Sequence, residues 1–178
     1  MDKILLLIVS GLFSVSVWAN IPEQLTKSVT GEVRYLGFIK VYDATLYTQA
    51  NATPENLLLP EVSRCLKLNY AVDLSKDKFI LATKTVLERQ NTAEDLGRVA
   101  KQMQLVNNSY TDIKKGDRYV MCFDRTSQHT KLYLNEKPVL SLAKSAEFAK
   151  VYMGMWLANK QPISVSLRNT FMNHMRKM

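Results

Sequence analysis

Segments with strand-like and helix-like patterns follow one another in blocks, and their order restricts the fold more than any single motif does. Three strand-like segments come first, two amphipathic helices follow, three more strands come next, and two helices end the chain. Strands and helices grouped in this way are typical of α+β proteins. We therefore predict an α+β fold with an antiparallel sheet and helices packed on one side. The predicted strands are residues 29–34, 38–47, 65–72, 118–123, 131–134 and 138–142.

Four residues suited to N-caps mark where the predicted helices begin, and they are Ser75, Thr92, Ser145 and Ser164. Thr92 is followed three residues later by Asp95, which predicts a capping box. The apolar stripe of this second helix continues to Val106, so we predict one uninterrupted helix there. The short polar connections around Gly116 and over residues 135–138 predict turns.

The stretch Tyr35–Tyr47 is rich in β-branched and aromatic residues and predicts an extended ribbon in the sheet, with a bend permitted at Gly37. Regular alternation would place Lys40 and Tyr42 on one face, in a row of otherwise apolar side chains. A lysine and a phenol in an apolar row are consistent with the wall of a ligand pocket. An ordinary strand with one solvated face, on which Lys40 extends its ammonium group into water, explains the pattern too.

Residues 1–19 have the pattern of a secretory signal peptide. Lys3 is followed by an apolar run, and Val17-Trp18-Ala19 supplies the small residues that a signal peptidase requires. The run is shorter than the ~20 apolar residues that span a bilayer. We predict cleavage after Ala19, a single domain over residues 20–178, and a periplasmic location.

Two cysteines, Cys65 and Cys122, lie in separate strand-like segments. In an oxidising compartment two such residues can form a disulfide bond, and two separate buried thiols are the alternative. Neither cysteine belongs to a Cys-x-x-Cys motif, so the sequence does not indicate redox catalysis.

The chain carries a formal net charge of +8. A basic surface suits anionic ligands, or peripheral contact with an anionic membrane. The basic residues are scattered, with Lys114-Lys115 and Arg176-Lys177 as the adjacent pairs, and we predict no nucleic-acid partner. A protein partner is left open.

The sequence offers few groups for catalysis. Its two histidines, His129 and His174, have no other potential metal ligands near them at a suitable spacing. The sequence contains neither a phosphate-binding loop nor a dinucleotide-binding glycine pattern. We therefore expect no metal and no cofactor.

Six blocks in order resemble the chalcone isomerase-like superfamily. They are Tyr35-Leu-Gly-Phe-x-Lys-Val-Tyr-Asp-Ala-x-Leu-Tyr47, Leu66-x-Leu-x-Tyr70, Lys115-Gly-Asp-Arg-Tyr119, Leu132-x-Leu-Asn135, Phe148-Ala-x-x-Tyr-x-Gly-x-Trp-Leu157 and Ser166-Leu-Arg168. The resemblance covers nearly all of residues 20–178 and is strongest to the exported bacterial members. It implies an open-faced β-sandwich, in which a helical layer covers a large antiparallel sheet and a ligand cleft lies between them.

The same resemblance argues against flavanone-forming isomerase activity. The catalytic threonine, tyrosine and asparagine of the plant enzymes correspond to Tyr42, to a position near Phe79 and to one near Val86. Phenylalanine and valine cannot supply the polar network that orients water and a ketone.

The fatty-acid-binding members pair an arginine with the tyrosine of a Lys-Val-Tyr block, which here is Lys40-Val41-Tyr42. The resemblance implies Arg34, Tyr42 and Lys40 as ligand contacts, because an arginine and a phenol can bind a carboxylate at the end of an apolar cleft. Arg34 as a solvated strand residue is the alternative. Arg118 and Arg168 are expected to form ion pairs or to anchor a turn and a helix.

The leading hypothesis is a non-catalytic binding protein for a small apolar anion such as a fatty acid. An interaction or scaffold protein with a vestigial cleft is the second hypothesis. An isomerase or lyase acting on another substrate is the third.

Overall fold

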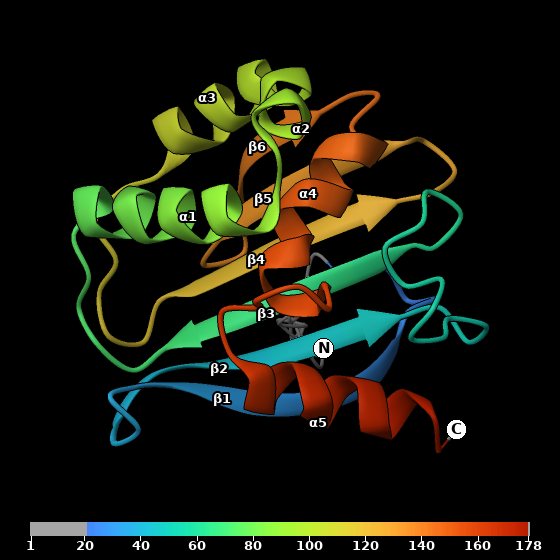
Figure 1. The fold of residues 1–178 in the computed structure, drawn as a ribbon, viewed down its shortest axis with the longest axis horizontal. Coiled ribbons are helices and arrows are strands. Elements are labelled where there is room, and N and C mark those ends of the chain that lie inside the picture. The colour runs from blue at the N-terminus through green and yellow to red at the C-terminus, as the bar shows by residue number, and fades with distance from the viewer. Residues whose placement is uncertain (1–20, 178) are drawn as a thin grey trace, which may run out of the picture.

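Each strand of the sheet pairs antiparallel with the next strand in the chain, in the order β1-β2-β3-β4-β5-β6 (Figure 1). The computed structural model describes residues 21–177, so the predicted signal peptide lies outside the described residues. The described strands are β1 (Thr26–Tyr35), β2 (Ile39–Thr48), β3 (Arg64–Tyr70), β4 (Arg118–Asp124), β5 (His129–Leu134) and β6 (Lys137–Leu142).

The helices lie over one face of this sheet, which confirms the predicted α+β arrangement (Figure 1). In Figure 1, α5 lies in front of β1, and α4 crosses the middle strands. Within the described residues the helices are α1 (Lys76–Gln90), α2 (Ala93–Arg98), α3 (Ala100–Ser109), α4 (Ala146–Leu157) and α5 (Val165–Met175). None of these helices has the length and apolar character needed to cross a membrane.

The main hydrophobic core lies between the sheet and the helices. Alternate residues of the strands, such as Ala44, Leu66 and Phe123, pack there against Phe148 and Phe171 from the helices. α5 approaches the sheet closely at Gly31, where an added Cβ atom would lie 2.6 Å from Cδ1 of Leu167. A glycine at this position of β1 is what permits the close packing.

The opposite face of the sheet carries a smaller hydrophobic cluster of Leu25, Cys65, Val120 and Cys122. Cys65 and Cys122 are register partners in β3 and β4 and form a disulfide bond. Of the two possibilities that the sequence left open, the structure has the disulfide. It joins two neighbouring central strands, and the two cysteines are 57 residues apart in the sequence.

A tight turn at Leu36 and Gly37 separates β1 from β2, which confirms the bend predicted at Gly37, and the extended ribbon itself is β2. The N–H of Phe38 donates to the carbonyl of Tyr35 at 3.3 Å, and Leu36 and Gly37 both have positive φ (52° and 80°). Positive φ at both central residues is typical of the type I′ turn, whose twist matches that of a β-hairpin. We call residues 35–39 the hairpin tip.

Two expectations about the helices also need correction. The second predicted helix is interrupted at Val99, which separates α2 from α3. Ser75 and Ser145 occupy N-cap positions, but their side chains do not cap the helices. An oxygen of Asp112 instead accepts from the N–H of Lys76, the first residue of α1. The capping box of Thr92 and Asp95 and the cap by Ser164 are present as predicted.

Candidate functional site

A large apolar hollow lies between the β1–β3 part of the sheet and helices α1 and α4, and we call it the sheet–helix cleft. Its volume is about 650 Å³, which is within the usual range for small-molecule sites. The cleft runs from exposed residues at its mouth, including Tyr35 and Ile39, to buried aromatic residues at its inner end. Its lining comprises Val33, Arg34, Tyr35, Ile39, Val41, Tyr42, Tyr70, Val72, Leu74, Lys78, Phe79, Ala82, Thr83, Met155, Trp156 and Ile163.

A β-bulge in β2 determines which side chains reach the cleft. Val33 pairs with Tyr42 and the next residue, Arg34, pairs with Lys40, so Val41 has no partner in β1. An extra residue in one strand interrupts the alternation of its side chains. Tyr42 therefore joins the cleft, whereas Lys40 extends toward Asp43. The expectation that Lys40 and Tyr42 share one face is wrong for this reason.

Tyr42 is fixed at the inner end of the cleft by a hydrogen bond from α4. The indole Nε1–H of Trp156 donates to the Tyr42 hydroxyl at 2.9 Å, and both side chains are buried. Burial raises the pKa of the Tyr42 phenol above its ordinary value, so the hydroxyl keeps its proton at neutral pH. The Tyr42 oxygen thus accepts from Trp156 and still carries a proton to donate.

Tyr70 lies beside Tyr42 at the inner end. Their ring centroids are 5.4 Å apart, and Tyr70 is only 3 % exposed. Within the described part of the chain, the Tyr70 hydroxyl has no hydrogen-bond partner. Burial, and to a lesser extent the neighbouring Tyr42, raises the pKa of Tyr70 well above the ordinary value for a tyrosine. Tyr70 is therefore a second neutral phenol on the wall of the cleft.

Arg34 is at the rim of the cleft, but its guanidinium is already engaged. Its Nε and Nη2 donate to the two carboxylate oxygens of Glu32 at 2.6 and 3.3 Å, and its Nη1 donates to the carbonyl of Phe38 at 3.0 Å. The hydrogen bond from Arg34 lowers the pKa of Glu32. The guanidinium thus holds β1 and the hairpin tip together, and among the described residues its hydrogen bonds go to Glu32 and Phe38 and not to Tyr42.

Lys40 does not line the cleft. Its ammonium lies 2.7 Å from a carboxylate oxygen of Asp43 and 4.0 Å from one of Glu32. The three residues predicted from the sequence as ligand contacts are therefore separated, because Tyr42 is at the inner end, Arg34 at the rim and Lys40 on an ion pair outside. Their role as ligand contacts stays a prediction.

Lys78 is the other basic residue of the lining. It is exposed on the first turn of α1, and none of the ion pairs within residues 21–177 involves it. Both basic side chains of the lining thus lie near the mouth of the cleft, away from the buried phenols.

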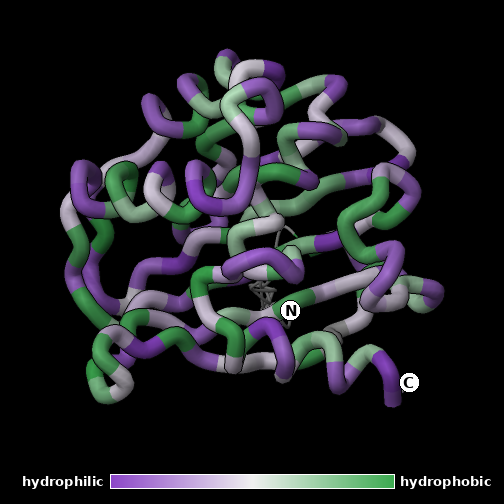
Figure 2. Tube along the Cα trace, in the orientation of Figure 1, coloured by the Kyte–Doolittle hydropathy of each residue, from purple (hydrophilic) through white to green (hydrophobic). Residues whose placement is uncertain are grey.

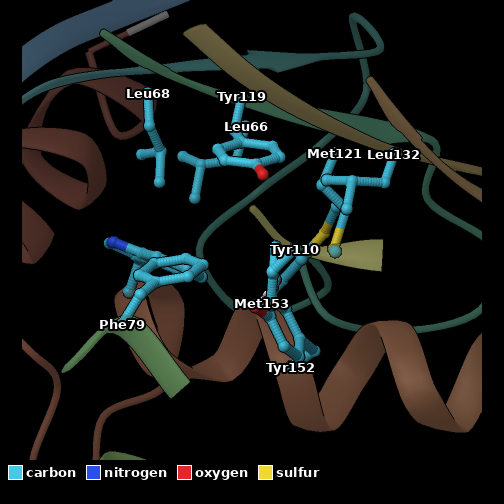
Figure 3. Close-up of a pocket in the computed structure, with 10 residues that line it drawn as sticks. Leu66, Leu68, Phe79, Tyr110, Tyr119, Met121, Leu132, Tyr152 and Met153 are labelled. Carbon is cyan, nitrogen blue, oxygen red and sulfur yellow. Dashed lines mark hydrogen bonds between the residues drawn. The ribbon is translucent and has the colours of Figure 1, made fainter. Parts of the chain in front are cut away.

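Behind the inner end, aromatic side chains fill the space between sheet and helices. Figure 3 shows side chains of the strands, including Leu66 and Tyr119, facing Phe79 of α1 and Tyr152 of α4. The hydroxyl groups of Tyr110 and Tyr152 share a short hydrogen bond. The cavity left among these side chains measures about 20 Å³, room for about one water molecule. A ligand of ordinary size therefore has space in the sheet–helix cleft and not deeper in the core.

The hairpin tip borders the mouth of the cleft and is unusually apolar for an exposed turn. Tyr35, Leu36 and Phe38 are each more than 60 % exposed. Figure 2 shows this segment, at the lower left, as a hydrophobic stretch at the edge of the molecule. A ligand entering the cleft passes an apolar rim.

Of the three positions compared above with isomerase catalysts, two lie at the cleft. Tyr42 and Phe79 line the cleft, whereas Val86 is buried in α1 away from it. Arg118 forms an ion pair with Glu136 at 2.6 Å, and Arg168 donates to the carbonyl of Leu157 at 3.1 Å, so both have the expected anchoring roles.

Tyr70, Trp156 and Lys78 belong to the site and were not predicted from the sequence. Tyr70 and Trp156 do lie in blocks that resemble the chalcone isomerase-like superfamily. The signal that could have found Tyr70 is the alternation of Leu66, Leu68 and Tyr70, which all belong to the main core. The contact between Tyr70 and Tyr42 depends on the register of β2 and β3. The contact between Trp156 and Tyr42 depends on how α4 packs on the sheet. A sequence pattern contains neither.

Comparisons with known proteins agree with this fold. A family model described as chalcone isomerase-like matches residues 23–172. This chain belongs to the chalcone isomerase-like family. No curated protein matches its sequence. Among solved structures, a fatty-acid-binding protein of Arabidopsis thaliana has a similar fold, with a TM-score of 0.64 at 14% identity, over 87% of this chain and 90% of that one.

Proposed function

We propose that this protein binds a small, mainly apolar ligand of the lipid class in the sheet–helix cleft, without transforming it. The observation that carries the proposal is a cleft of about 650 Å³ that is lined mostly by apolar side chains and ends on buried phenols. Burial of an apolar chain in such a site is favourable at roughly 25 cal/mol per Å² of apolar surface. The likeness in fold to a protein named for binding fatty acids supports a ligand of this kind.

The composition of the lining favours binding over catalysis. The phenols of Tyr42 and Tyr70 hold their protons at neutral pH, so neither is a ready general base. Phe79 stands at the cleft where the isomerases have a tyrosine, and it has no hydroxyl. These features support a binding role.

Native mass spectrometry of the purified protein, followed by organic extraction, tests the proposal. We expect a stoichiometric lipid-sized mass on the wild-type protein, either from the cell or after incubation with mixed lipids. Ala82 lines the cleft from an exposed position on α1, so Ala82→Phe should obstruct binding. Leu81→Phe is the matched control, because Leu81 is exposed next to it and does not line the cleft. A wild-type protein that stays empty would favour the scaffold hypothesis instead.

We also propose that the protein acts in the periplasm. The signal-peptide pattern of residues 1–19 and the disulfide between Cys65 and Cys122 support this, since disulfides persist in oxidising compartments. Cell fractionation with N-terminal sequencing tests it. A mature chain beginning at Asn20 is the expected result, and an intact N-terminus in the cytoplasm would overturn it.

A further inference from the structure

The inner end of the sheet–helix cleft presents a hydrogen-bonding group that the protein itself does not use. The hydroxyl of Tyr70 is buried and, within residues 21–177, has no hydrogen-bond partner. Buried polar groups in proteins are nearly always paired. Because Tyr70 also lines the cleft, a ligand atom can supply the missing partner.

Tyr42 provides a second donor beside it. Its oxygen accepts the Nε1–H of Trp156, and no acceptor for its own proton occurs among the described residues. The rings of Tyr42 and Tyr70 are neighbours, with centroids 5.4 Å apart. Two neighbouring phenols at the inner end thus carry protons that have no acceptor among the described residues, which matches an oxygen with two lone pairs, such as that of a carbonyl group.

Within residues 21–177, no basic side chain lies beside these two phenols. Arg34 is engaged by Glu32 and the carbonyl of Phe38, Lys40 by Asp43, and Lys78 is exposed at the mouth. Moving a carboxylate out of water without a cation is far more costly than moving a neutral carbonyl that gains hydrogen bonds. The inner end therefore favours an uncharged acceptor over an anion.

We propose that Tyr42 and Tyr70 together donate hydrogen bonds to an uncharged carbonyl oxygen, as in an ester, ketone or quinone, at the inner end of the cleft. The inference rests on the proposed binding function and narrows it. It departs from the carboxylate site that the sequence resemblance implied for Arg34 and Tyr42. The ligand is then a neutral lipid-like molecule whose apolar chain extends toward the mouth.

A matched ligand series tests this proposal. Lauric acid, methyl laurate and undecyl methyl ketone share an apolar chain and differ in the charge of the head group. We expect the ester and the ketone to bind at least tenfold more tightly than the acid at alkaline pH, as measured by calorimetry. The affinity of the acid should rise as the pH falls through its own carboxyl pKa, because only the protonated acid suits the site. This arm needs no variant.

Two variants test whether the Tyr70 hydroxyl causes the preference for the ester over the acid. Tyr70→Phe should lower the affinity for the ester on the order of tenfold, the scale of one lost hydrogen bond, and should leave the acid at alkaline pH unchanged. Tyr133→Phe, on the opposite face of the sheet, is the control and should change neither affinity.

The possible results distinguish the inference of an uncharged acceptor from the proposed binding function. If the acid binds as tightly as the ester at alkaline pH and Arg34→Ala abolishes that binding, the uncharged-acceptor inference is overturned while the binding function stands. If none of the three probes binds, the proposed function is overturned as well.

Discussion

Trp156 donates its indole N–H to the hydroxyl of Tyr42 at 2.9 Å, and this contact joins α4 to β2 across the inner end of the sheet–helix cleft. The two residues are 114 positions apart in the sequence. The bond connects the helical layer to the sheet at the point where a ligand would reach the core. It therefore links the stability of the fold to the shape of the site.

Tyr42→Phe should destabilise the protein by about 1–3 kcal/mol, because it leaves a buried indole N–H without its acceptor. Urea unfolding measures the change. Tyr47→Phe is the matched control, since Tyr47 is in the same strand and packs on the opposite face. Equal stability of the two variants would show that the bond to Trp156 is not made in solution.

Loss of the disulfide should destabilise the protein by up to about 4 kcal/mol in the chain-entropy model for a loop of this length, given the separation of 57 residues between Cys65 and Cys122. The measurement compares unfolding with and without reductant. The double variant Cys65→Ala/Cys122→Ala should unfold like the reduced wild-type protein and should not respond to reductant. A wild-type protein whose stability is the same before and after complete reduction of the disulfide would contradict this prediction.

Gly31→Ala should destabilise the protein by about 1–3 kcal/mol, because its Cβ atom would lie 2.6 Å from Cδ1 of Leu167 and push α5 from β1. Gly97→Ala is the control, since no atom lies within 4 Å of a Cβ there and Gly97 is inside α2. Replacing a glycine inside a helix with alanine is stabilising by about 0.5–1 kcal/mol. The two glycine variants should therefore shift Tm in opposite directions, and shifts of the same sign would argue against the close packing of α5.

Leu36→Asn should stabilise the hairpin by about 0.5–1 kcal/mol, because Leu36 has a φ of 52° and asparagine adopts this conformation more readily. Thermal unfolding measures the gain. Leu36→Ala keeps the same unfavourable φ and removes only the exposed side chain, so it should change the stability little. A loss of stability in Leu36→Asn would indicate that the leucine side chain makes a packing contact that outweighs the turn.

The capping box predicts a dependence on pH. The hydrogen bonds of Asp95, first that with the side chain of Thr92, lower its pKa from the usual 3.8 in the folded protein. The carboxylate therefore contributes stability that is fully present above this unfolded-state value and is lost as the pH falls through the lower folded-state pKa. The stability difference between wild type and Asp95→Asn should be positive at neutral pH and shrink in strong acid. Glu94→Gln, on the same helix but outside the cap, should show a smaller difference at neutral pH.

The strands and most helices could be predicted because local patterns determine them. Strand-like segments bounded by turn residues marked β4 to β6, and Thr92 and Ser164 marked helix starts that the structure retains. The interruption at Val99 was missed because the apolar stripe continues through it, so the pattern alone gives no sign of a break.

The site was harder to predict because it depends on register. The turn at Leu36 places a branched residue at positive φ, which sequence rules disfavour, and the bulge at Val41 then reverses the face on which Lys40 lies. The sequence identified Tyr42 but could not show that Trp156 and Tyr70 meet it. The engagement of Arg34 by Glu32 depends on side-chain geometry, which a sequence pattern does not contain.

The most direct test of the central claim is the indole N–H signal of Trp156 in a proton–nitrogen correlation spectrum. The sequence has two tryptophans, Trp18 and Trp156, and the expected cleavage after Ala19 removes Trp18, so the mature chain should give a single indole signal. We predict that methyl laurate shifts this signal in a saturable manner and that Ala82→Phe prevents the shift. An indole signal that stays unchanged at saturating ligand, while Tm also stays the same, would contradict a ligand at the inner end of the cleft.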